Sequence, residues 1–115
     1  MSDTSTGTAG YGERDAQYLY VCISNEISPP PPGARARDVV HAEHVVFLQD
    51  LFDRSILFGS GPRVEENGTR HGGAVYILQN VTYEEAKAIT AQEPTIREGL
   101  RDVTVHPWRR MWFGG

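Results

Sequence analysis

Apolar and polar residues are spaced along the chain in a pattern that predicts six elements. Short runs of aromatic and β-branched residues are typical of strands, and apolar residues at three- and four-residue steps are typical of amphipathic helices. The predicted order is strand, helix, strand, strand, helix, strand. The strands are expected near residues 18–23, 56–58, 74–78 and 103–106, and the helices at 39–54 and 83–92.

Start and stop signals accompany the two predicted helices. Asp38 is a candidate N-cap for the first helix. Thr82 and Glu85 form a capping box for the second helix, which Pro94 should end. The apolar stripe of the first helix consists of Val40, Phe47, Leu48, Leu51 and Phe52.

Turn residues separate the predicted strands. The first strand is followed by a proline-rich connection at residues 28–33, which we expect to be a stiff polyproline loop. Gly59–Pro62 is expected to end the second strand, and Asn67-Gly68 is a strong hairpin signal before the third. Pro107 cannot donate a ladder hydrogen bond, so the last strand should lie at an edge of the sheet or contain a bulge.

Successive side chains of a strand point to opposite faces of a sheet, and here both faces are apolar. Leu19, Val21 and Ile23 share an aliphatic face of the first strand, whereas Tyr20 and Cys22 lie on an aromatic and mixed face. Two helices cover only one face, and we expect them to cover the aliphatic one. The other face then needs a second cover. The simplest cover is another copy of the chain, so the pattern predicts a homodimer that could pair further through its tail or proline loop.

Length and composition narrow the class of protein. The 115 residues fit one domain. We expect residues 1–16, which are rich in Ser, Thr, Gly and charge, to form a flexible tail before a single domain over residues 17–113. The net charge of −4 argues against nucleic-acid binding. The chain has no apolar run long enough to cross a membrane and no secretory pattern at its start, so we expect a cytoplasmic protein.

Most motifs that carry chemistry are missing from the sequence. There is no phosphate-binding loop, dinucleotide glycine fingerprint or cysteine pair for zinc, so we expect no cofactor. His41 and His44 lie three residues apart, but no third metal ligand is evident, and a metal or haem site is not favoured. The single cysteine, Cys22, lies in an apolar strand and is interpreted as a buried structural thiol.

His44 falls within the apolar stripe of the first helix and should point inward. A histidine in such a position is most often a hydrogen-bonded core residue. It is also the natural general acid or base at neutral pH, provided that a carboxylate or carbonyl group holds its tautomer. Glu93, at the end of the second helix, could supply that carboxylate if the two helices pack side by side.

Several segments together resemble the YCII (YciI-like) family. They are the stretch HVVFLQDLFDRSILFGSGP from His44, Ala74-Val75-Tyr76-Ile77, Gln92-Glu93-Pro94, and Val103-Thr104-Val105-His106-Pro107-Trp108. The resemblance covers about residues 18–112. It implies an α+β fold, a ferredoxin-like βαββαβ unit with an antiparallel four-stranded sheet, which dimerises into an α/β barrel.

The resemblance also implies a site and two functions. His44 falls on the family's proposed catalytic histidine, and Glu93 stands where the family has an aspartate before proline. The first function is a cofactor-independent enzyme, an isomerase or lyase acting on a small ring compound by proton transfer or halide elimination. Tyr20, Tyr76 and Gly61-Pro62 would then line the substrate pocket. The alternative is a non-catalytic dimeric module that binds a small molecule or is associated with stress.

Overall fold

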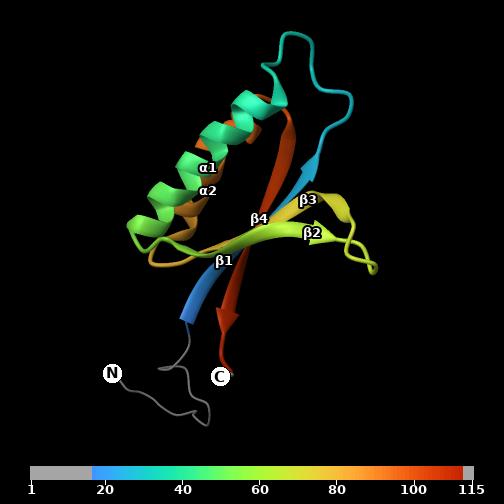
Figure 1. The fold of residues 1–115 in the computed structure, drawn as a ribbon. Coiled ribbons are helices and arrows are strands. Elements are labelled where there is room, and N and C mark those ends of the chain that lie inside the picture. Colours follow the sequence, from blue (N-terminus) through green and yellow to red (C-terminus); the bar gives the residue numbers. More distant parts are fainter. Residues whose placement is uncertain (1–16, 113–115) are drawn as a thin grey trace, which may run out of the picture.

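A computed structural model describes residues 17–112, which form a layer of helices packed on a sheet (Figure 1). The strands are β1 (Gln17–Glu26), β2 (Leu57–Val64), β3 (Arg70–Leu78) and β4 (Arg101–Arg110), and the helices are α1 (Arg37–Asp53), α2 (Tyr83–Gln92) and α3 (Pro94–Arg97). The tail predicted for residues 1–16 lies outside the described residues, as does residue 113 of the predicted domain.

The four strands form one antiparallel sheet in the order β2-β3-β1-β4, with β2 and β4 at its open edges. Figure 1 shows α1 and α2 lying together on one face of this twisted sheet. The order and direction confirm the predicted ferredoxin-like βαββαβ fold. No helix within residues 17–112 is long and apolar enough to cross a lipid bilayer.

Three local predictions are confirmed by the structure. Thr82 and Glu85 make both hydrogen bonds of the capping box at the start of α2. The β2–β3 connection turns at Gly68, whose φ of 88° is one that glycine adopts without strain. Pro107 lies on the edge strand β4, opposite Tyr20, where its missing N–H costs no hydrogen bond to a further strand.

The expected ends of two elements are wrong. The first helix begins at Arg37, after Ala36 as N-cap, so Asp38 lies in its first turn and does not cap it. Strand β2 does not stop at Gly59–Pro62 but continues through these residues to Val64, with irregular register on either side. An edge strand tolerates glycine, proline and bulges because one side of it has no ladder to maintain.

The helices cover the aromatic and mixed face of the sheet, which corrects the expectation that they cover the aliphatic one. The core between the helices and the sheet contains Tyr20, Cys22, Leu51, Tyr76, Leu78 and Ala86. On the opposite face, Val21, Ile23, Val75 and Ile77 are only half-buried, whereas Leu19 is fully buried. Both faces are apolar, and the longer aromatic side chains are the ones that fill the space beneath the helices.

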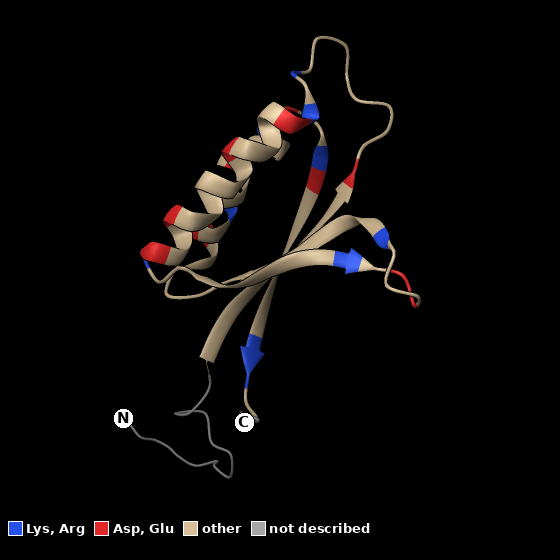
Figure 2. Cartoon of the chain, in the orientation of Figure 1, with Lys and Arg blue, Asp and Glu red and all other residues tan. Residues whose placement is uncertain are grey.

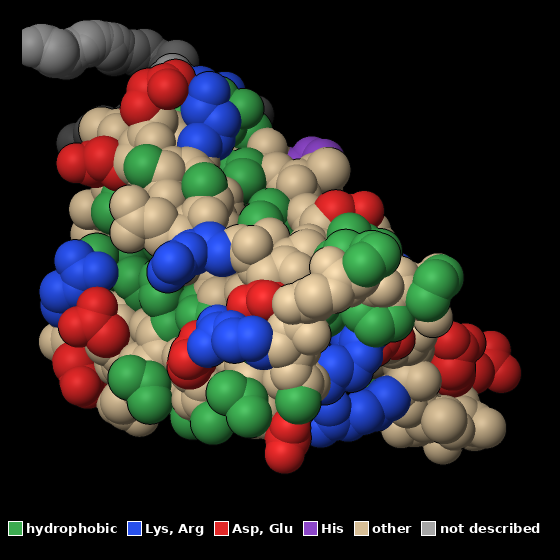
Figure 3. Space-filling view, turned by 90° about the horizontal axis from the view of Figure 1, so that it is seen from above, with side chains coloured by type: hydrophobic (Ala, Val, Ile, Leu, Met, Phe, Trp, Pro, Cys, Tyr) green, Lys and Arg blue, Asp and Glu red, His purple; other side chains and the backbone are tan. Residues whose placement is uncertain are grey.

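The outer surface combines charged and apolar patches. Acidic residues lie along the helices, whereas many basic residues lie toward the ends of the strands (Figure 2). Hydrophobic side chains also reach the surface in several patches, separated by charged ones (Figure 3). Phe52, which was assigned to the buried stripe of α1, is one of the exposed residues, with 64% of its surface accessible.

Candidate active site

Helix α1 carries His44 on its buried face. The buried residues of this helix are Val40, His44 and Leu51, at steps of four and seven residues that place them on one side. His44 is 8% exposed, so it points inward, as its position in the apolar stripe predicted. His41, one turn earlier on α1, is exposed, and its ring centroid lies 5.6 Å from that of His44.

The short segment between α2 and α3 positions Glu93. Its backbone is extended (φ −61°, ψ 129°), which ends α2, and Pro94 begins α3 immediately afterwards. The carboxylate folds over the start of α3, where its Oε2 accepts hydrogen bonds from the N–H of Thr95 at 2.8 Å and of Ile96 at 3.3 Å, and from the Thr95 hydroxyl. Glu93 is 1% exposed, so its charge is satisfied entirely inside the protein.

The other carboxylate oxygen of Glu93 joins His44. The Nδ1 of His44 donates a hydrogen bond to Oε1 of Glu93. The sequence suggested this pair, and packing of α1 against α3 brings the two side chains together. Because Nδ1 carries the proton, the Nε2 of a neutral His44 presents its lone pair. Among residues 17–112 it has no hydrogen-bond partner.

Burial and hydrogen bonding act in opposite directions on Glu93. Burial by itself raises the pKa of this carboxyl group, because it penalises the charged form. The hydrogen bonds from His44 and Thr95 outweigh burial and hold the pKa of Glu93 below its usual value. Glu93 is therefore an anion at neutral pH, and it can stabilise the positive charge of His44 when the imidazole takes up a proton.

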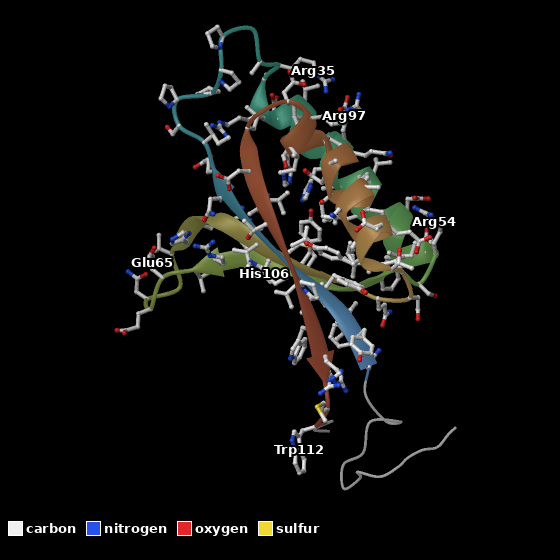
Figure 4. The ribbon with its side chains drawn as sticks, turned by 180° about the vertical axis from the view of Figure 1, so that it is seen from behind. Arg35, Arg54, Glu65, Arg97, His106 and Trp112 are labelled. Carbon is white, nitrogen blue, oxygen red and sulfur yellow. The ribbon has the colours of Figure 1, made fainter. Side chains whose placement is uncertain are left out.

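An exposed cluster of charged residues connects the loop before α1 to α1 itself and to the end of α3. The Arg35 guanidinium contacts Glu43, the neighbour of His44 on α1, with two distances of 2.8 Å. It also contacts Glu98, just after α3, at 2.8 Å, and the backbone N–H of Arg35 donates to Glu98 at 2.9 Å. Figure 4 shows Arg35 at this end of the helices, close to Arg97. The cluster links the loop, α1 and α3, the last two of which carry the histidine and the glutamate.

Tyr76 lies in the buried core between the sheet and the helices. Tyr76 points from β3 toward the helices and is 3% exposed. Burial raises the pKa of Tyr76 strongly, and the negative charge of Glu93 raises it further. The phenol therefore stays protonated throughout the physiological range.

The other predicted pocket residues lie elsewhere. Tyr20 is buried, but its ring stacks on Tyr83 at the start of α2, the end of that helix remote from Glu93. Gly61 pairs with Val75 and thus lies at a position on the sheet face opposite the helices. Pro62 is on the helix side but is exposed on the edge strand β2. Of the four predicted wall residues, Tyr20 and Tyr76 are buried in the core beneath the helices, whereas Gly61 and Pro62 lie on the edge strand β2.

Two further buried residues were not identified from the sequence. Thr95 donates to Glu93 through both its N–H and its hydroxyl. The order Glu93-Pro94-Thr95, an acidic cap followed by proline at the first helical position, could have indicated it. Ser24, on β1, is 1% exposed, and its hydroxyl has no hydrogen-bond partner among the described residues. Nothing in the sequence marks Ser24.

The thiol of Cys22 is shielded from solvent, and the described residues hold no cluster of metal ligands. The Cys22 thiol is fully buried, and its Sγ donates weakly to the carbonyl oxygen of Tyr20 at 3.6 Å. Burial raises the pKa of this thiol to about 12, so it is not a nucleophile at neutral pH, and its interpretation as a buried thiol is confirmed. Within residues 17–112, no three His, Cys, Asp or Glu side chains are grouped so that they could hold a metal ion.

Comparison with known proteins supports the fold and defines the family. A search of curated proteins finds no match. Among solved structures, the fold is similar to 5-chloro-2-hydroxyhydroquinone dehydrochlorinase (TftG) from Burkholderia phenoliruptrix AC1100, in complex with 2,5-dihydroxybenzoquinone. The two share 18% identity with a TM-score of 0.58, over 78% of this chain and 92% of that one. The family model of the YCII-related domain matches residues 17–109, most of the chain, and the protein therefore belongs to the YCII family.

Proposed function

We propose that this protein is a cofactor-independent enzyme that moves a proton on a small, oxygen-bearing ring compound, with His44 as general acid and base. The observation that carries this proposal is the buried hydrogen bond between His44 and Glu93. A carboxylate on Nδ1 holds the imidazole in one tautomer, leaves Nε2 as the base and stabilises the imidazolium that forms. The similar fold of a dehydrochlorinase that acts on a ring compound supports this class of chemistry.

The proposed step balances without any further reactant. Nε2 of His44 takes a proton from the ring compound, and the electron pair of the broken bond shifts into the ring. In an isomerisation, the imidazolium returns the proton at another ring atom. In a dehydrohalogenation, the halide leaves with the electron pair of its bond to carbon, and His44 later loses the proton to water. A positioned histidine of this kind contributes about 10²- to 10⁴-fold in rate.

A turnover assay tests the proposal. Purified protein is mixed with chlorinated hydroxyhydroquinones, and absorbance and released chloride are followed. His44→Ala should lower kcat at least 100-fold, whereas His41→Ala, the same change one turn away on the exposed side of α1, should retain turnover. Circular dichroism checks that both variants fold, and His44→Asn serves if the alanine variant does not. Equal turnover in the His44 variant and the wild type would overturn the role of His44. No turnover by the wild type would favour the non-catalytic binding protein.

We also propose that the chain acts as a homodimer whose copies meet through the sheet face opposite the helices. The half-buried residues Val21, Ile23, Val75 and Ile77 support this proposal, because the described chain leaves this aliphatic face without helices. Trp108, 43% exposed, occupies the same face of β4. A face with this much apolar surface is typical of an interface between subunits.

A further inference from the structure

Two hydroxyl groups beneath the helices are left without partners. Within residues 17–112, the only buried side-chain oxygen or nitrogen atoms that lack a hydrogen bond are Oγ of Ser24 and Oη of Tyr76. Both residues are more than nine-tenths buried. Leaving a buried hydroxyl unsatisfied costs free energy, so protein sites that contain such groups usually bind water or a ligand through them.

The two hydroxyl-bearing residues come from neighbouring positions of one sheet face. Tyr76 on β3 is paired with Cys22 on β1, and Ser24 is the next β1 residue on that face. Such diagonal neighbours lie about 7–8 Å apart at their backbones. Both therefore belong to the surface on which the helices pack.

The part of the sheet that carries Ser24 lies near the segment that joins α3 to β4. Ser24 pairs with Val103, close to where β4 begins after α3, and the N–H of Ile27 donates to Leu100 at 2.9 Å just beyond it. Glu93 is the N-cap of α3 in the same region, where the N–H of Leu100 also donates to the carbonyl oxygen of Thr95 at 2.9 Å. Figure 4 shows side chains from the sheet and from the helices meeting between the two layers.

We propose that Tyr76 and Ser24 form an oxygen-binding subsite beside His44, in which their hydroxyls donate hydrogen bonds to a carbonyl or phenolate oxygen of the ring compound. This inference rests on the proposed function and specifies its ligand class: a ring that carries an anionic or carbonyl oxygen close to the atom whose proton His44 handles. About 10% of the His44 side chain is exposed, so the imidazole is not completely shielded from solvent.

The two hydroxyl groups and the His44–Glu93 pair have complementary chemistry. Tyr76 and Ser24 are neutral donors, whereas Glu93 is an anion that faces His44 and the start of α3. When His44 removes a proton, negative charge develops on the ring and is delocalised onto its oxygens. A donor aimed at such an oxygen stabilises that charge more than it stabilises the neutral ring. Tyr76 would thus act on the oxygen and His44 on the proton.

Binding measurements separate this inference from the proposed catalysis. The probe is 2,5-dihydroxybenzoquinone, titrated by calorimetry into the wild type, Tyr76→Phe and Ser24→Ala, with p-xylene as a ring of similar outline without oxygen. Tyr76→Phe should weaken quinone binding about 10-fold or more, and Ser24→Ala several-fold. Binding of p-xylene should not change. Tyr18→Phe, at an exposed tyrosine of β1, is the matched control and should not alter quinone binding.

The variants also distinguish a ligand-binding hydroxyl from a structural one. If Tyr76 binds ligand, Tyr76→Phe should unfold at the same or a higher temperature than the wild type, because a partnerless buried hydroxyl has been removed. Unchanged quinone affinity in both variants, a lowered melting temperature with unchanged affinity, or no quinone binding by the wild type at millimolar concentration would each overturn the subsite. Selective loss of binding alongside an inactive wild type would instead overturn only the proposed catalysis.

Discussion

The imidazole of His44 and the carboxylate of Glu93, 49 residues apart in the chain, share a hydrogen bond in the interior of the protein. One carboxylate oxygen serves the histidine and the other caps α3. Glu93 therefore joins the fold and the candidate chemistry in a single side chain. Changes at this residue should affect stability and proton transfer together.

Replacement of Glu93 should be strongly destabilising. Glu93→Ala removes the partner of His44 and the cap of α3 at once, and we expect the free energy of unfolding to fall by about 3 kcal/mol. Glu93→Gln keeps an acceptor oxygen and should lose less. Urea denaturation followed by circular dichroism measures both. An alanine variant within 0.5 kcal/mol of the wild type would contradict the role assigned to Glu93.

The lowered pKa of Glu93 predicts a specific loss of stability in acid. A carboxyl group whose pKa is lower in the folded state stabilises the fold fully above its unfolded pKa, near 4.5. This stabilisation is lost as the pH falls through the lower, folded pKa. Thermal unfolding from pH 6 to pH 2 should therefore show a steeper loss below about pH 4.5 in the wild type than in Glu93→Gln. Parallel curves for the two proteins would argue against the shift.

The exposed cluster around Arg35 should restrict the motion of the loop before α1 but contribute little to the stability of the whole domain. Arg35→Ala frees the loop before α1 from Glu43 and Glu98, so hydrogen exchange in residues 27–44 should become faster while the melting temperature changes little. Arg54→Ala, which removes an exposed contact to Asp50 at the other end of α1, is the control. Equal exchange in residues 27–44 of both variants would show that the cluster does not hold the loop.

Cys22 should be protected from thiol reagents in the native protein. Full burial and a pKa of about 12 leave almost no thiolate at pH 8. A chromogenic disulfide reagent should therefore react with the folded protein far more slowly than with the protein in denaturant, where one thiol per chain should react at once. Rapid and complete reaction under native conditions would contradict the buried position of Cys22.

The proposed homodimer predicts different effects of a charge on the two faces of the domain. Ile77→Glu places a carboxylate on the sheet face opposite the helices and should convert a dimer into a monomer. Val46→Glu places it on α1, where Val46 is 69% exposed, and should leave the mass unchanged. Size-exclusion chromatography with light scattering measures both. A wild type of monomeric mass at micromolar concentration would rule out the interface.

Part of the candidate site could be predicted because it depends on short-range periodicity. The inward direction of His44 follows from its spacing to Val40, and both residues are buried on α1. The end of α2 at Pro94 follows from the geometry of proline, and it places Glu93 between two helices. Neither observation requires knowledge of distant contacts.

The sequence pattern did not decide which sheet face the helices cover or whether Gly59–Pro62 forms a turn or a strand. Strand parity separates Tyr20 and Cys22 from Val21 and Ile23, but both sets are apolar, so the pattern does not say which lies under the helices. Gly59–Pro62 has the composition of a turn, yet it lies in an edge strand, where pairing with β3 on one side is sufficient. The outcome in each case was decided by neighbours that are remote in the chain.

The sequence by itself determined the order of the elements, the hairpin at Asn67-Gly68, the capping box of α2 and the inward position of His44. All of these arise from interactions within a few residues. Only the tertiary structure decided which sheet face is covered, that Glu93 reaches His44, and that the hydroxyls of Tyr76 and Ser24 are buried without partners. These depend on how α1, α3 and the sheet pack in three dimensions, because a hydrogen bond between distant residues forms only where packing brings its two atoms within reach.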